Sequence, residues 1–122
     1  MADKSQREPN FGPLSPIALH VLLSLAEGDK HGYAIIKDIR RRTSDQLKPG
    51  ASTLYSVLRR LLDEGLVAEA RSRPEFALDD ERRRYFSLSS RGRHAALEEL
   101  QRMETVLDRG RSKRLLLGHR GA

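Results

Sequence analysis

The sequence of 122 residues contains no cysteine and no tryptophan, and aromatic residues make up only 5% of it. The lack of cysteine excludes disulfides, thiolate zinc sites, thiol redox sensing and a cysteine nucleophile. No run approaches the roughly 18 consecutive apolar residues that a transmembrane helix needs. Residues 1–10 are polar and lack the apolar core of a signal peptide. We therefore expect a cytoplasmic protein that makes no contact with a membrane.

Recognisable arrangements of catalytic residues are missing as well. The sequence has no glycine-rich phosphate loop, and its four histidines, His20, His31, His94 and His119, do not stand at the spacing of a metal site. No serine has a histidine and an acidic residue in a plausible context for nucleophilic attack. The sequence predicts no enzyme activity, no metal and no cofactor. His31 is better explained as a helix-start or packing residue.

Basic residues dominate what the sequence does contain. Lysine and arginine number 23 against 17 acidic residues, a formal net charge of +6, and 18 of the 23 are arginine. Such a surplus favours polyanionic partners, and arginine suits bidentate contacts with bases and phosphates. A hydrophobic fraction of 38% is enough for one modest core. We therefore expect a single domain that gains stability by self-association or from a partner.

The pattern of apolar residues predicts three helices, two short strands and a last long helix. The first helix is apolar nearly all round, which predicts burial on more than one side. In chain order, the expected elements are a helix from Ser15 and Pro16 to Gly28, a helix over about 31–43, a helix from Ser52 or Thr53 to Gly65, strands over 66–71 and 82–88, and a helix from Ser89 or Ser90 to about Arg109.

Three helices followed by a β-hairpin form the winged variant of the helix-turn-helix domain. The predicted fold class is therefore mainly α with a small β-hairpin, extended by a long C-terminal dimerisation helix. The predicted organisation is a flexible N-terminal arm over residues 1–13, a winged helix-turn-helix DNA-binding domain over 14–89, the dimerisation helix over 90–110, and a basic, partly disordered tail over 111–122.

The third helix is predicted to read DNA, because a helix fits the major groove and this one has a clean polar half. Hydroxyl groups in its first turn suit phosphate contacts, and Arg59 is the best candidate for a guanine edge. Tyr55 could instead pack against the edge of the core. The candidate DNA-binding residues of this helix are Ser52, Thr53, Tyr55, Ser56, Arg59 and Arg60.

The predicted hairpin carries four further candidates, Arg71, Arg73, Arg82 and Arg83, which suit phosphates or a narrow minor groove. An alternative is that the arginines of residues 82–84 pair with the acidic residues 79–81 as a solvated surface run.

Dimerisation is predicted for the last helix and the first. The last helix has an apolar stripe spaced four, three and four, as in a short coiled-coil seam. The stripe could instead pack on its own domain, but little local core remains there to be covered. The candidate interface residues are Leu19, Leu22 and Leu23 in the first helix, and Ala96, Leu100, Met103 and Leu107 in the last.

Several short motifs occur in a fixed order along residues 15–95. They are the apolar run 19–25, His31-Gly32-Tyr33, Gly50-Ala51-Ser52-Thr53-Leu54-Tyr55, Arg59-Arg60-Leu61, Glu64-Gly65-Leu66-Val67, residues 82–88 and residues 89–92. As a set they resemble the PadR-like family of transcriptional regulators. The resemblance implies a dimeric bacterial repressor of the small subtype, with one C-terminal dimerisation helix. It also implies a small-molecule effector at the dimer interface, for which the sequence shows no obvious aromatic platform. Regulation without a ligand, by a sensor partner or by the level of the repressor itself, stays open.

The function predicted from these observations is sequence-specific binding of double-stranded DNA. We expect a repressor that binds a palindromic operator as a homodimer, with half-sites about 10 bp apart or a multiple of that. Two alternatives remain open. One is a winged-helix module for protein–protein contact, although such an interface would carry more aromatic residues than the third helix does. The other is a non-specific, nucleoid-associated DNA binder.

Overall fold

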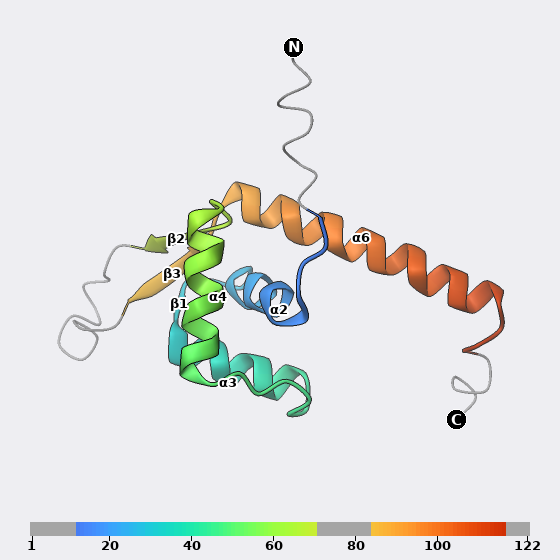
Figure 1. Cartoon of the computed structure of the whole chain (residues 1–122), viewed down its shortest axis with the longest axis horizontal. Coiled ribbons are helices and arrows are strands. Elements are labelled where there is room, and N and C mark those ends of the chain that lie inside the picture. The colour runs from blue at the N-terminus through green and yellow to red at the C-terminus, as the bar shows by residue number, and fades with distance from the viewer. Residues whose placement is uncertain (1–11, 71–83, 117–122) are drawn as a thin grey trace, which may run out of the picture.

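The structure is a computed structural model and describes residues 12–70 and 84–116 (Figure 1). The predicted fold class, mainly helical with a small β element, is confirmed, and no helix in the described ranges is long and apolar enough to cross a membrane. The elements are the helices α2 (Pro16–Leu25), α3 (Gly32–Arg42), α4 (Ala51–Asp63) and α6 (Ser90–Ser112), and the strands β1 (Lys30–His31), β2 (Val67–Ala70) and β3 (Tyr85–Leu88).

Three helices begin at side chains that satisfy their first free backbone N–H groups. Ser15 Oγ and Ser89 Oγ each accept a hydrogen bond from the N–H three residues on, at 3.1 and 2.9 Å. His31 Nδ1 caps α3 in the same way, at 3.2 Å, which confirms a helix-start role for this histidine. The helix α4 differs, because it begins at Ala51, earlier than predicted, after Gly50 and without a side-chain cap.

The sheet has three antiparallel strands in the order β1-β3-β2, where the sequence predicted a hairpin of two. The additional strand, β1, has only two residues, which are too few to show an alternating pattern. Lys30 and Glu69 both lie opposite Phe86 in the register, one on each side of β3. The sheet therefore joins the start of α3 to the strands of the predicted hairpin.

The helix α2 lies at the centre of the molecule, with α4 and α6 on different sides of it (Figure 1). Its apolar surface is therefore covered within the chain, by α3, α4, α6 and β3, and not by another subunit as expected. Leu19 is 5% exposed and Leu22 is completely buried, and Ala96 of α6 is only 7% exposed. These three predicted interface residues are core residues, and Leu23 is partly buried against the same core.

The start of α6 is fixed to the end of α4. Ser89 Oγ donates a hydrogen bond of 2.6 Å to the Gly65 carbonyl oxygen. Gly92 lies so close to Leu66 that a methyl group on Gly92 would stand 2.0 Å from the Leu66 carbonyl oxygen. From this joint α6 runs past the body of the molecule (Figure 1), through Gly110, where the sequence predicted its end, to Ser112.

Candidate nucleic-acid interface

The helix α4 divides into a buried half and an exposed half, as the sequence predicted. Leu54, Leu58 and Leu61 are at most 2% exposed and pack into the core. The opposite side forms one surface, here called the α4 face, and its members are the exposed residues Ser52, Thr53, Tyr55, Ser56, Arg59 and Arg60. The structure thus brings together all the residues of this helix that were predicted to bind DNA.

The two arginines of the α4 face differ in their surroundings. Arg60 Nε lies 3.5 Å from Glu64 Oε2, one helical turn away. Arg59 makes no hydrogen bond or ion pair with any residue in the ranges 12–70 and 84–116. Its guanidinium can therefore bind an external partner without first breaking an ion pair.

Tyr55 packs against the edge of the core, which is one of the two roles considered for it. Its ring packs edge-on against Phe86, with centroids 6.4 Å apart, and its hydroxyl group lies over the backbone of Gly32. The residue nevertheless remains 40% exposed. Tyr55 therefore fixes α4 against α3 and β3, while its contact with DNA stays a prediction.

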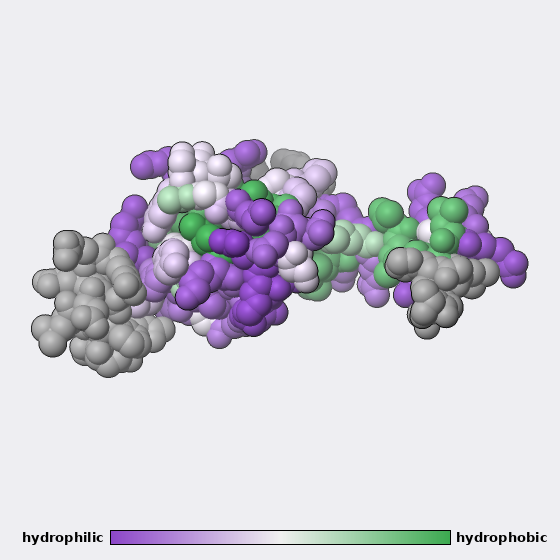
Figure 2. Space-filling model, turned by 90° about the horizontal axis from the view of Figure 1, so that it is seen from below, coloured by the Kyte–Doolittle hydropathy of each residue, from purple (hydrophilic) through white to green (hydrophobic). Residues whose placement is uncertain are grey.

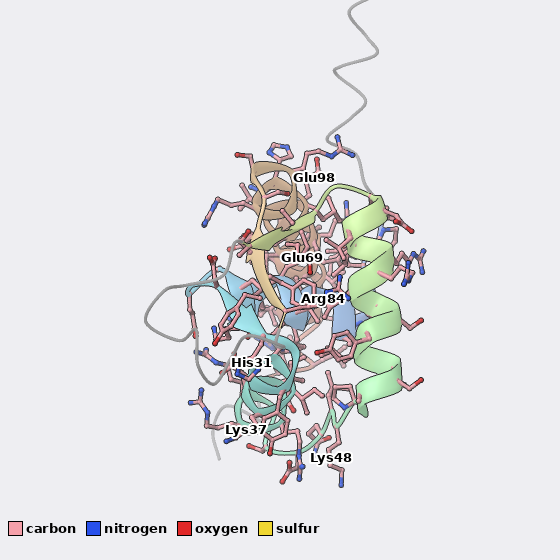
Figure 3. All side chains as sticks on the ribbon, turned by 90° about the vertical axis from the view of Figure 1, so that its left-hand side faces the viewer. His31, Lys37, Lys48, Glu69, Arg84 and Glu98 are labelled. Atoms are coloured by element: carbon pink, nitrogen blue, oxygen red, sulfur yellow. The ribbon has the colours of Figure 1, made fainter. Side chains whose placement is uncertain are left out.

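An ion pair stands beside the α4 face at the start of β3. Arg84 Nε and Nη2 donate to the two carboxylate oxygens of Glu69, at 2.5 and 3.2 Å. These hydrogen bonds lower the pKa of Glu69 and raise that of Arg84, so both groups are charged near neutral pH. Figure 3 shows both side chains between the strands and α4. Sequence reasoning missed Glu69, because only the strand register places it beside Arg84.

A hollow of about 320 Å³ separates α4 from the start of β3. Its lining joins the α4 face to Arg84 and Phe86, and also includes the acidic residue Asp63. The predicted hairpin residues Arg71, Arg73, Arg82 and Arg83 lie outside the described residues, so their role stays a prediction.

Two lysines that the sequence analysis did not single out lie near the beginning of α4. Lys48 is exposed two residues before Gly50, and Lys37 projects from α3 at the same end of the molecule (Figure 3). Lys37 Nζ stands 5.4 Å from the ring centroid of Tyr33. By contrast, the nearby arginines of α3 are held by acidic groups: the buried Asp38 accepts from Arg41 and Arg42, at 2.6 and 3.0 Å.

The helix α6 exposes an apolar stripe where it leaves the body (Figure 2). Leu100, Met103 and Leu107, all predicted to bind a second subunit, are 39%, 49% and 42% exposed. They line a wide hollow together with Pro13 and other residues of the helix. In the isolated chain these side chains are therefore accessible to a second molecule.

Two charged residues of α6 hold the segment that precedes α2. Glu99 Oε1 accepts from the Leu14 N–H at 3.0 Å and from Arg102 Nη2 at 2.8 Å, and Arg102 Nη2 also donates to the Gly12 carbonyl oxygen at 2.7 Å. The hydrogen bonds from Arg102 and then Leu14 lower the pKa of Glu99. The four residues Gly12, Leu14, Glu99 and Arg102 are called the α6 clamp.

No cluster of acidic residues and histidines that could hold a metal occurs in the described part of the chain.

The helices α3 and α4, with the exposed basic face of α4 next to a small antiparallel sheet, form a winged helix-turn-helix, an architecture of DNA-binding proteins. Residues 21–99 match the transcriptional regulator PadR-like family, and the chain belongs to that family. It is thus a DNA-binding transcriptional regulator and not an enzyme. No curated protein is significantly similar to it.

Solved structures share this fold. A transcriptional regulator from Clostridium thermocellum is 26% identical, with a TM-score of 0.64 over 75% of this chain and 84% of that one. A PadR family regulator from Clostridium difficile is 21% identical, with a TM-score of 0.68 over 80% and 97% of the two chains. Bacillus subtilis PadR, solved in complex with operator DNA, is 20% identical, with a TM-score of 0.59 over 72% of this chain and 48% of that one.

Proposed function

We propose that this protein is a repressor that binds a palindromic operator as a homodimer, with the α4 face of each subunit in the major groove. The observation that carries the proposal is the exposure of Arg59, free of ion pairs to described residues, beside the hydroxyl groups of Ser52, Thr53 and Ser56. A guanidinium in that state suits bidentate contact with guanine, while hydroxyl and N–H groups at a helix start suit phosphate. Bacillus subtilis PadR, of the same fold, was solved on operator DNA.

The homodimer is supported by the apolar stripe of α6. Leu100, Met103 and Leu107 are spaced for a helical seam and are exposed in the single chain. A second copy of α6 would bury the stripe and relate the two α4 helices by a two-fold axis, which in turn requires a palindromic operator. The small-molecule effector implied by the resemblance remains a prediction.

Replacement of Arg59 by alanine tests the proposal. An operator would first be selected from a random-sequence DNA library with the purified protein, and binding to it and to an unrelated duplex would then be measured by fluorescence anisotropy. We expect R59A to lose roughly 10- to 100-fold on the operator and much less on the unrelated duplex, since a bidentate base contact contributes about 1–3 kcal/mol.

The matched control is R109A, which removes the same charge from the exposed far part of α6. An equal loss on both duplexes would assign Arg59 to phosphate binding and contradict base reading. If the selection yields no preferred sequence although duplexes bind, the non-specific nucleoid-associated alternative applies. Absence of any binding to DNA would favour the protein-interaction module.

A further inference from the structure

We propose that Arg84 contacts the DNA backbone at the base of the hairpin, and that Glu69 and Phe86 orient its guanidinium for this contact. The inference rests on the proposed function, because it adds one contact to the same DNA surface. Arg84 is not among the arginines of the hairpin that the sequence predicted to bind DNA.

The guanidinium of Arg84 is held on two sides and open on a third. Glu69 occupies Nε and Nη2, and the Arg84 Cζ atom stands 5.4 Å from the centroid of the Phe86 ring. The remaining nitrogen, Nη1, makes no hydrogen bond to any residue that the structure describes. Because the Arg84 side chain is 52% exposed, its N–H donors at Nη1 can reach an external acceptor.

Arg84 itself lies next to the proposed DNA surface. Arg84 lines the same hollow as Ser52, Ser56 and Arg59 of the α4 face. A duplex seated on the α4 face therefore passes over the hollow, where a phosphate oxygen can accept from Arg84 and neighbouring hydroxyl groups. The carboxylate of Asp63 is in the same lining and repels a phosphate, so the direction of the Arg84 donors matters for the contact.

The pair is poorly explained as a support for the sheet alone. Glu69 and Phe86 are already partners in the β2–β3 register, so the backbone holds the strands together without the ion pair. Exposed ion pairs contribute at most about 1 kcal/mol to stability, and often nothing measurable. A carboxylate that fixes the guanidinium instead holds its remaining N–H donors, here those of Nη1, in one direction for a negatively charged partner.

The contact is tested by the salt dependence of binding to a random-sequence 30-bp duplex, since a phosphate contact does not depend on sequence. We expect R84Q to weaken binding and to reduce the slope of log affinity against log salt by about 0.9 per bound subunit. The control R109Q removes the same charge from the exposed end of α6, far from the strands (Figure 1), and should leave the slope unchanged.

A slope for R84Q equal to that of the unaltered protein would overturn the proposed contact while leaving the proposed function intact. If the unaltered protein bound no duplex at all, the proposed function itself would fail, and the contact with it. Thermal unfolding of each variant verifies that a change in slope does not arise from an unfolded protein.

The orienting role of Glu69 is tested against Glu64, the carboxylate that pairs with Arg60. E69Q and E64Q remove the same charge, so both gain affinity through long-range electrostatics, and each releases one arginine. Only Arg84 loses a fixed orientation, because Glu69 holds it by two hydrogen bonds while Glu64 makes a single contact of 3.5 Å with Arg60. We expect E69Q to bind roughly 2- to 10-fold more weakly than E64Q. This difference should disappear when both are made in R84Q, because Glu69 acts through Arg84. Equal affinity of E69Q and E64Q, or a difference that persists in R84Q, would contradict the orienting role.

Discussion

Two glycines at the beginnings of helices allow close approaches between elements, but their neighbours differ in how far they can move. A methyl group on Gly92 would stand 2.0 Å from the Leu66 carbonyl oxygen, which is backbone. A methyl group on Gly32 would stand 2.2 Å from the hydroxyl oxygen of Tyr55, the far end of a side chain. The first clash requires a shift of a whole element, while the second requires the rotation of one ring.

We therefore expect G92A to lower the free energy of unfolding by about 1–3 kcal/mol, the usual cost of overpacking, and G32A to lower it by less. Chemical denaturation followed by circular dichroism measures both. G110A is the matched control, because Gly110 lies within α6 with nothing within 4 Å of the added carbon. It should stabilise the protein by up to about 1 kcal/mol. A cost for G32A larger than that for G92A would show that Tyr55 has no room to turn.

At this scale the sequence predicts what is local and misses what is distant. The caps Ser15, Ser89 and His31 can be predicted because each contacts backbone three residues away. The pairing of Glu69 with Arg84 has no local signal, since 15 residues separate the partners. The predicted grouping of the α4 residues is confirmed, because helical periodicity alone determines which side chains share a face.

Among the elements, α6 has a pH-dependent contact, because the α6 clamp joins it to the segment that precedes α2. The folded protein lowers the pKa of Glu99, so the stabilisation from its ionised form is fully present above the ordinary pKa and is lost as pH falls through the lowered one. We expect E99Q to unfold at a lower temperature than the unaltered protein at pH 7, with a difference that shrinks as the pH falls toward about 3. Thermal unfolding across this range measures the effect.

E104Q serves as the control for the α6 clamp, because Glu104 is exposed on the same helix. Its unfolding temperature should follow that of the unaltered protein at every pH. A difference between E99Q and the unaltered protein that stays constant down to acid pH would show that packing, and not the ionised carboxylate, fixes Gly12 and Leu14 to α6.

The elements also show why a pattern can fail. The sequence predicts a hairpin of two strands, but Lys30 and His31 extend it to three, and two residues carry no periodicity that could reveal them. The burial of Leu19 and Leu22 was assigned to a second subunit because α2 is apolar nearly all round. Only the tertiary arrangement shows that α6, which is distant in sequence, covers α2 within the chain.

For the whole molecule, the central prediction is the assembly of two chains through α6. Replacing Met103 by glutamate puts a charge into the stripe without disturbing the core, because Met103 is 49% exposed. Burial of an unpaired charge in a seam is costly, so we expect M103E to be monomeric at a concentration at which the unaltered protein is a dimer. Light scattering coupled to size-exclusion chromatography measures this directly.

T105E adds the same charge to another exposed position of α6 that does not belong to the stripe, and it should remain dimeric. A monomeric unaltered protein at micromolar concentration would count against the dimer and against the palindromic operator derived from it.

The joint between α4 and α6 has a mechanical consequence. Ser89 and Gly92 hold the first turn of α6 to the chain immediately after α4, by a side-chain hydrogen bond and by close backbone contact. The helix α6, which would contact the second subunit, therefore moves together with α4, which would enter the major groove. In a dimer that two α6 helices hold together, a small change in their crossing angle changes the distance between the two α4 helices. The crossing angle of the two α6 helices would thus match the spacing of the two α4 helices to the helical repeat of DNA. A change in this angle would release the operator.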